Sequence, residues 1–126
     1  MTPRSGVLLL LLTLAACATA GPARRASSSD VISRAEIETS RASNAYELVQ
    51  QLRPQFLRSR GPSSMRDPRA GYPVVYINDV SHGSVDVLRT IRLEEIDEIR
   101  YISSSDATTR WGTGHAGGVI QVRANY

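Results

Sequence analysis

Cysteine is almost absent from this chain, whose 126 residues contain only Cys17. A single thiol excludes an intramolecular disulfide and leaves no cysteine cluster for a structural zinc ion. Histidine is nearly as scarce, because only His82 and His115 are present and neither has a second ligand at helical spacing. We therefore expect no bound metal and no cofactor.

Lysine is missing altogether, so all 15 basic residues are arginine. The formal net charge is +3, and the arginines are scattered among 12 carboxylates. Nucleic-acid binding requires clustered positive charge that faces phosphates, and the sequence has no such basic stripe. The composition therefore argues against nucleic acid as a partner, and we attribute the arginine-only usage to genome composition.

Long apolar runs are also lacking, apart from Val7 to Ala16, which is broken only by Thr13. A membrane-spanning helix needs about 20 mostly apolar residues, so this run is too short to span comfortably. Arg4 precedes the run and Leu14-Ala15-Ala16-Cys17 closes it, which is the layout of a signal peptide. The sequence predicts a signal peptide over residues 1–16.

The closing residues Leu14-Ala15-Ala16-Cys17 resemble the bacterial lipobox, whose cysteine is acylated through sulfur and becomes the amino terminus. The resemblance implies a lipoprotein with lipid, such as palmitate, on Cys17 and with the membrane as a partner through that anchor. Ala18, in place of an aspartate, implies the outer membrane, with the domain facing the periplasm. An ordinary secretory signal remains the alternative. Residues 17–30 hold the lipidated cysteine and a small, polar stretch typical of a flexible tether.

Two helices are expected near the start of the folded region. Ser33 and Glu36 have the spacing of a capping box, which predicts a short first helix. A second helix begins near Ser43, because its apolar residues recur at helical spacing, and Pro54 limits its length. The stretch from Gly61 to Gly71 has the composition of a surface loop.

Strands and helical turns alternate in the second half of the chain. The β-branched runs predict strands at residues 74–77, 98–102 and 119–123, and Asn78-Asp79 suits a hairpin turn. Helical turns are expected after Ser84 and after Ser105-Asp106, which are suitable caps. This order predicts an α+β domain over residues 31–126, with short helices packed on a small mixed β-sheet.

Several short motifs imitate catalytic or cofactor sites. Residues 112–117 match G-x-G-x-x-G, but a dinucleotide site needs a strand before the glycines and a helix after them, and here the order is reversed. Residues 81–86 contain serine, histidine and aspartate, yet close neighbours in sequence cannot converge as a hydrolase triad. The acidic residues of 94–98 are better explained as a solvated face. We expect no enzyme.

The larger pattern resembles the plug domain of TonB-dependent outer-membrane receptors, over about residues 31–124. The resemblance rests on four segments in the family's order: Pro73 to Val80, Leu93 to Ile102, Ala107 to Gly112, and Gly117 to Val122. Two residues depart from the family pattern, since Asp79 replaces the usual turn glycine and Trp111 stands where tyrosine or phenylalanine is common. The chain also stops at Tyr126, without a membrane barrel, so we do not expect it to be a transporter itself.

The resemblance implies a lipid-anchored, non-catalytic module that contacts an outer-membrane or other envelope protein. We expect contacts through loops at 58–72 and 80–84, with Tyr72, Asn78, Asp79, His82 and Trp111 as interaction residues. One alternative is a periplasmic small-ligand or carbohydrate-binding lipoprotein, which would need a cleft lined by two or more of Tyr72, Tyr76, His82 and Trp111. The weakest alternative is a small hydrolase using His82 or His115.

Overall fold

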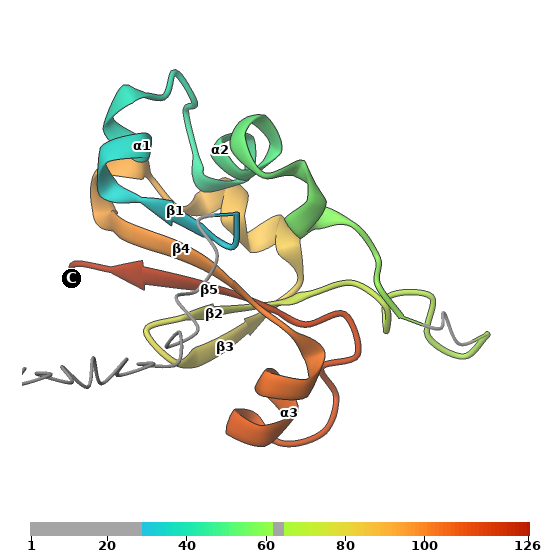
Figure 1. Ribbon diagram of the computed structural model, residues 1–126. Coiled ribbons are helices and arrows are strands. Elements are labelled where there is room, and N and C mark those ends of the chain that lie inside the picture. The colour runs from blue at the N-terminus through green and yellow to red at the C-terminus, as the bar shows by residue number, and fades with distance from the viewer. Residues whose placement is uncertain (1–28, 62–64) are drawn as a thin grey trace, which may run out of the picture.

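The computed structural model describes residues 29–61 and 65–126, which fold as one sheet with helices on both faces (Figure 1). Short helices on a small mixed sheet are the α+β architecture that the sequence predicts, and the prediction is confirmed. With η denoting a 3-10 helix, the elements in chain order are β1 (Val31–Ser33), α1 (Arg34–Thr39), α2 (Ala45–Leu52), η1 (Pro54–Leu57), β2 (Val74–Ile77), β3 (Val80–Gly83), η2 (Val85–Thr90), η3 (Leu93–Glu95), β4 (Ile96–Ile102), α3 (Ser104–Trp111) and β5 (Val119–Ala124).

The last strand of the chain lies at the centre of the sheet. The strand order is β1-β4-β5-β2-β3, so β5 has a neighbour on each side. It pairs antiparallel with β4 and parallel with β2, which makes the sheet mixed. The two edges are short, because β1 has three residues and β3 has four with a register shift against β2. Short and bulged edge strands discourage pairing with another sheet.

The larger core fills the space between one sheet face and α1, α2, η1 and η2 (Figure 1). Alternating side chains of each strand point to this face, as period-two strands require. The largest fully buried side chains of this core come from both layers: Ile32, Leu48, Val49, Phe56, Val75, Leu88, Ile96, Ile99, Ile120 and Val122. At about 25 cal/mol per Å² of buried apolar surface, this layer contributes most of the stabilising free energy.

The first helix begins as the capping box predicts. The Ser33 hydroxyl accepts a hydrogen bond from the backbone of Glu36, and the Glu36 carboxylate accepts one from the Ser33 backbone at 2.9 Å. This backbone N–H, together with the Arg53 guanidinium at 2.9 Å, lowers the pKa of Glu36. The second helix starts at Ala45, with Asn44 as its cap, close to the predicted start.

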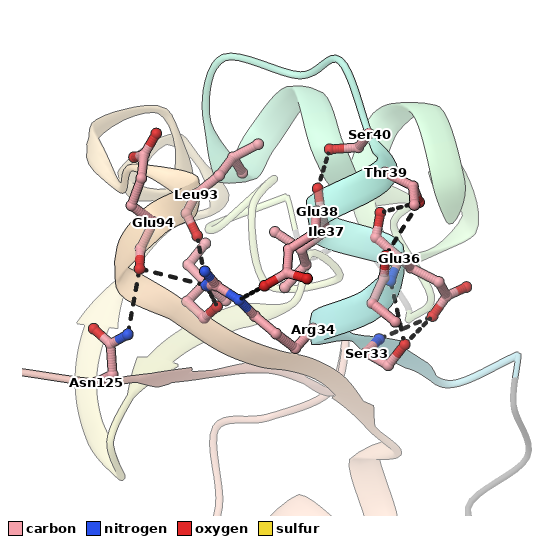
Figure 2. Close-up of polar contacts among 12 residues, drawn as sticks. Ser33, Arg34, Glu36, Ile37, Glu38, Thr39, Ser40, Leu93, Glu94 and Asn125 are labelled. Atoms are coloured by element: carbon pink, nitrogen blue, oxygen red, sulfur yellow. Dashed lines mark hydrogen bonds and ion pairs between the residues drawn. The ribbon is translucent and has the colours of Figure 1, made fainter.

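Arg34 joins the first helix to the entrance of β4 (Figure 2). Its guanidinium donates to the carbonyl oxygen of Ile96 at 2.6 Å, and at longer range to the carbonyls of Leu93 and Glu94. The same guanidinium forms an ion pair with Glu38 at 2.8 Å, one turn along the helix. These bonds tie the first residue of α1 to carbonyl groups of η3 and of the first residue of β4.

The second sheet face is covered at one end by α3 (Figure 1). Tyr76, Ala107 and Val119 are buried in this smaller cluster, and Trp111 packs against it. The helix is capped by Ser103, whose hydroxyl accepts from the backbone of Asp106 at 3.2 Å. The predicted cap at Ser105-Asp106 is therefore displaced by two residues.

Other sequence-based expectations need correction. Residues 80–83 form strand β3 and do not form the predicted interaction loop. The short strand β1 was not predicted, and β4 begins at Ile96, two residues before the predicted start. Ser84 precedes η2 but makes no side-chain capping bond, because its hydroxyl contacts Asp86 instead.

Candidate functional site

The β2–β3 turn uses Asn78 to close the sheet. Asn78 has φ 46°, a left-handed conformation that asparagine tolerates better than most residues. Its side-chain oxygen accepts from the backbone N–H of Ala124 at 2.9 Å, and its amide donates to the Ala124 carbonyl at 3.1 Å. The side-chain amide thereby makes the two hydrogen bonds that one further backbone residue of β2 would make with β5. Asn78 thus has a structural role in the turn, and its role as an interaction residue stays a prediction.

Asp79 follows in the turn with φ 70°, the region in which glycine is favoured. Its carboxylate oxygen Oδ1 accepts from Arg110 of α3 at 2.7 Å and from the side chain of Gln121 at 2.9 Å. The carboxylate thus connects the turn to α3 and to the central strand. This connection explains what the aspartate contributes in place of a turn glycine.

Around Asp79 lies a polar hollow of about 270 Å³. It is on the same sheet face as α3, beside the end that this helix covers. Its charged side chains come from four parts of the fold: Asp79 from the turn, Glu98 and Arg100 from β4, Arg110 from α3 and Arg123 from β5. Arg100 forms an ion pair with Glu98 at 3.0 Å. We name this site the arginine hollow.

Sequence reasoning missed the arginine hollow. The alternation of residues 98–102 and 119–123 indicates that each strand has a polar side, but it does not show that the two strands are neighbours. In the structure Arg100 pairs with Gln121, and Glu98 pairs with Arg123. Side chains of directly paired residues lie on the same face of an antiparallel sheet, which brings these polar residues together.

Residues from both segments in which interaction loops were predicted, 58–72 and 80–84, line a second, mostly apolar hollow of about 390 Å³. Arg69 and Tyr72 reach it from the first segment, and Gly83 and Ser84 from the second, beside Val85. Tyr72 is 45% exposed, which leaves its ring accessible. Of the four aromatic and histidine residues expected to line a ligand cleft, only Tyr72 borders this hollow.

Tyr76, Trp111 and His115 form a packed aromatic cluster under α3. The rings of Tyr76 and Trp111 lie 4.4 Å apart between centroids. The Nδ1 of His115 lies 2.9 Å from the carbonyl oxygen of Gly112, which can only accept, so Nδ1 carries the proton. In the neutral ring Nε2 then accepts from the Tyr76 hydroxyl at 2.9 Å. Trp111 thus packs against this cluster while it remains partly exposed, and its role as an interaction residue stays a prediction.

The glycine-rich segment after α3 serves close packing. Gly118 has φ 81°, and a β-carbon there would collide with the Tyr101 hydroxyl and with the backbone of Ile102. A β-carbon on Gly117 would meet the backbone of Gly71 and Tyr72. The Tyr101 hydroxyl donates to the Gly117 carbonyl at 2.9 Å. These contacts explain the glycines without a bound nucleotide.

The remaining predicted site residues are not brought together. His82 is exposed on the edge strand β3. Within residues 29–61 and 65–126, no group of three or more histidine, cysteine, aspartate and glutamate side chains could hold a metal ion. The same residues contain no helix that is both long and apolar enough to span a membrane. Cys17, the predicted lipidation site, lies outside the described residues.

Comparison with known proteins gave one match. A family model, the TonB-dependent Receptor Plug Domain, matches residues 22–119 of the chain. No curated protein and no solved structure matches it.

Proposed function

Because the chain belongs to the TonB-dependent receptor plug domain family, we propose that it is a lipid-anchored, non-catalytic plug module that binds another protein of the cell envelope. The observation that carries the proposal is the extent of the family match, which covers most of the folded region. Plug domains belong to outer-membrane receptors, so the match supports an envelope location.

The proposed anchor is Cys17. Residues 1–16 would be removed as the signal peptide, residues 17–30 would carry the lipid and form the tether, and residues 31–126 would be the plug-like domain. Each buried methylene of a lipid chain contributes about 0.8 kcal/mol, so several chains hold a protein stably on a membrane. We propose that the anchor is in the outer membrane and that the domain faces the periplasm.

The side-chain arrangement supports a non-catalytic role. Both ring nitrogens of His115 are engaged, one by the Tyr76 hydroxyl and one by the Gly112 carbonyl. A triad requires a histidine held between a nucleophile and a carboxylate, and in the described residues a backbone carbonyl stands where the carboxylate would be. His82 is exposed at the sheet edge, where the surroundings provide little control over its chemistry.

A second candidate function is small-ligand or carbohydrate binding, which the apolar hollow beside Tyr72 favours. A volume of about 390 Å³ is at the lower end of the size of small-molecule pockets. The hollow has one aromatic wall, whereas carbohydrate sites commonly stack a sugar on aromatic rings. We therefore keep this function second to protein interaction.

The anchor is tested by the intact mass of the protein from the membrane fraction, beside a Cys17→Ser variant. The expected result is a diacyl or triacyl mass on a chain that begins at residue 17, and loss of that mass in the variant. An unmodified chain cleaved elsewhere would contradict the anchor.

The interaction is tested by in-cell photo-crosslinking from position 72, which borders the apolar hollow, with the exposed position Gln50 on α2 as the control. A discrete crosslinked envelope protein obtained from position 72 and not from position 50 is the expected result. Equal crosslinking from both positions, or none, would contradict binding through this surface.

A further inference from the structure

The arginine hollow collects positive charge in a part of the chain that has none in excess. Arg4, Arg24 and Arg25 lie outside the described residues, so the described part contains as many carboxylates as arginines. Within it, Arg100, Arg110 and Arg123 nevertheless line one hollow, against two carboxylates. The hollow therefore has a local surplus of one positive charge.

The two carboxylates position two of the guanidinium groups. Asp79 holds one amino nitrogen of Arg110 at 2.7 Å, and Glu98 holds Arg100 at 3.0 Å. A guanidinium has five N–H donors, so each of these pairs leaves donors available on the same group. Arg110 is also placed over the ring of Trp111, with 4.6 Å between its central carbon and the ring centroid. These contacts restrict the side chains before any ligand arrives.

Arg123 differs from the other two arginines. It lies opposite Glu98 in the register of β4 and β5, on the same sheet face. Its guanidinium has no hydrogen-bond or ion-pair partner among residues 29–61 and 65–126, and its side chain borders the hollow. All of its N–H donors are therefore available to an anion in the hollow.

We propose that the arginine hollow is an oxyanion site that binds a phosphate group. Guanidinium groups match phosphate oxygens in charge and in planar, paired geometry, and charge-assisted hydrogen bonds of this kind are about twice as strong as neutral ones. The hollow, at about 270 Å³, has ample room for a phosphate beside its ester group. Arg123 is the principal ligand, and Arg100 and Arg110 supply further donors.

The proposal rests on the proposed function in one respect. A domain tethered to a bilayer by a short segment meets phospholipid headgroups at high local concentration, and these supply phosphate diesters. Soluble phosphate is the other source of the same chemistry. A diester carries one negative charge and two ester substituents, whereas inorganic phosphate carries more charge at neutral pH, so the two sources can be separated.

The test uses the full chain in a non-ionic detergent and two probes, inorganic phosphate and glycerophosphoglycerol, the deacylated headgroup of phosphatidylglycerol. Each is titrated at constant ionic strength against a chloride reference, and binding is followed by backbone amide NMR signals. Arg123→Gln is compared with Arg92→Gln, which removes an equal charge from an exposed residue outside the hollow. We expect saturable binding that Arg123→Gln weakens about tenfold, the equivalent of about 1.4 kcal/mol, and that Arg92→Gln changes less than twofold.

Tighter binding of glycerophosphoglycerol identifies a lipid headgroup as the ligand, and tighter binding of inorganic phosphate identifies the soluble anion; either result supports the site. Absence of saturable binding by both probes overturns it, as does an equal loss in the two variants. Arg100→Gln gives a second reading if Arg123→Gln fails to fold. The intact mass at Cys17 is independent of these titrations, so failure of the anchor and failure of the oxyanion site remain distinguishable.

Discussion

Removal of Arg34 should destabilise the fold through lost carbonyl contacts and not through its lost ion pair. The guanidinium donates to three carbonyl oxygens at the entrance of β4, the shortest bond being 2.6 Å to Ile96. A hydrogen bond to a charged group contributes about 1.5 to 3 kcal/mol. Because the Arg34 side chain is 41% exposed, we expect Arg34→Ala to lower the free energy of unfolding by about 2 kcal/mol, in the lower part of that range.

The partner variant Glu38→Ala separates the two contributions. This carboxylate pairs with Arg34 on the helix surface, where it is 61% exposed, and exposed pairs of this spacing contribute about 0.3 to 0.5 kcal/mol. Urea unfolding followed by Trp111 fluorescence should therefore show a large loss for Arg34→Ala and a small one for Glu38→Ala. For a domain of this size, a loss of about 2 kcal/mol lowers the melting temperature by about 10 °C. Equal, small losses in both variants would refute the argument.

Three further predictions follow from local geometry. Gly118→Ala should cost about 2 kcal/mol or more in urea unfolding, because it adds a positive-φ strain to a collision with Tyr101; an unchanged midpoint would contradict this. Asn78→Ala should lower the free energy of unfolding by about 2 kcal/mol, because two hydrogen bonds to Ala124 are lost. The loss should be about 1 kcal/mol larger than for Asn78→Gly, because glycine adopts the positive φ of the turn more easily than alanine; equal losses in the two variants would contradict this. The pKa of Glu36 is lowered by the backbone N–H of its capping box and by Arg53, so its stabilisation is present above the unfolded value of about 4.3 and is lost as pH falls through the folded value. The melting temperature of Glu36→Gln should therefore fall less than that of the original protein as the pH is lowered over that interval. The free energy involved is less than about 1 kcal/mol, because the carboxylate is partly exposed.

Local signals in the sequence predicted the parts of the fold that depend on near neighbours. The capping box needs only Ser33 and Glu36, three residues apart, and it forms as predicted. The hairpin turn at Asn78-Asp79 is similarly local, since both residues tolerate positive φ. These features follow from backbone chemistry within one turn of chain.

Features that depend on distant segments were not accessible from sequence. Strand β1 has three residues and leads directly into a helix, so it has no detectable alternation of its own. Strand β3 is exposed throughout, and its serine, histidine and glycine do not favour a strand. The arginine hollow depends on the pairing of β4 with β5 and on a contact between Arg110 and Asp79 across 31 positions. Long-range pairing created this site.

The family resemblance indicated which segments belong to one domain, which the local patterns do not show. It also identified Asp79 and Trp111 as departures from the residues usual in the family. Contacts in the structure explain both residues, because Asp79 binds Arg110 and Gln121, and Trp111 packs on Tyr76.

The central position of β5 makes the whole sheet depend on the residues that follow Gly118. Without residues 119–124, the sheet separates into a β1–β4 pair and a β2–β3 pair, and isolated two-stranded units are marginally stable in water. We therefore expect the five-stranded sheet to form only when residues 119–124 are available to join the two pairs. A chain truncated before Val119 should be degraded instead of accumulating as a partial domain.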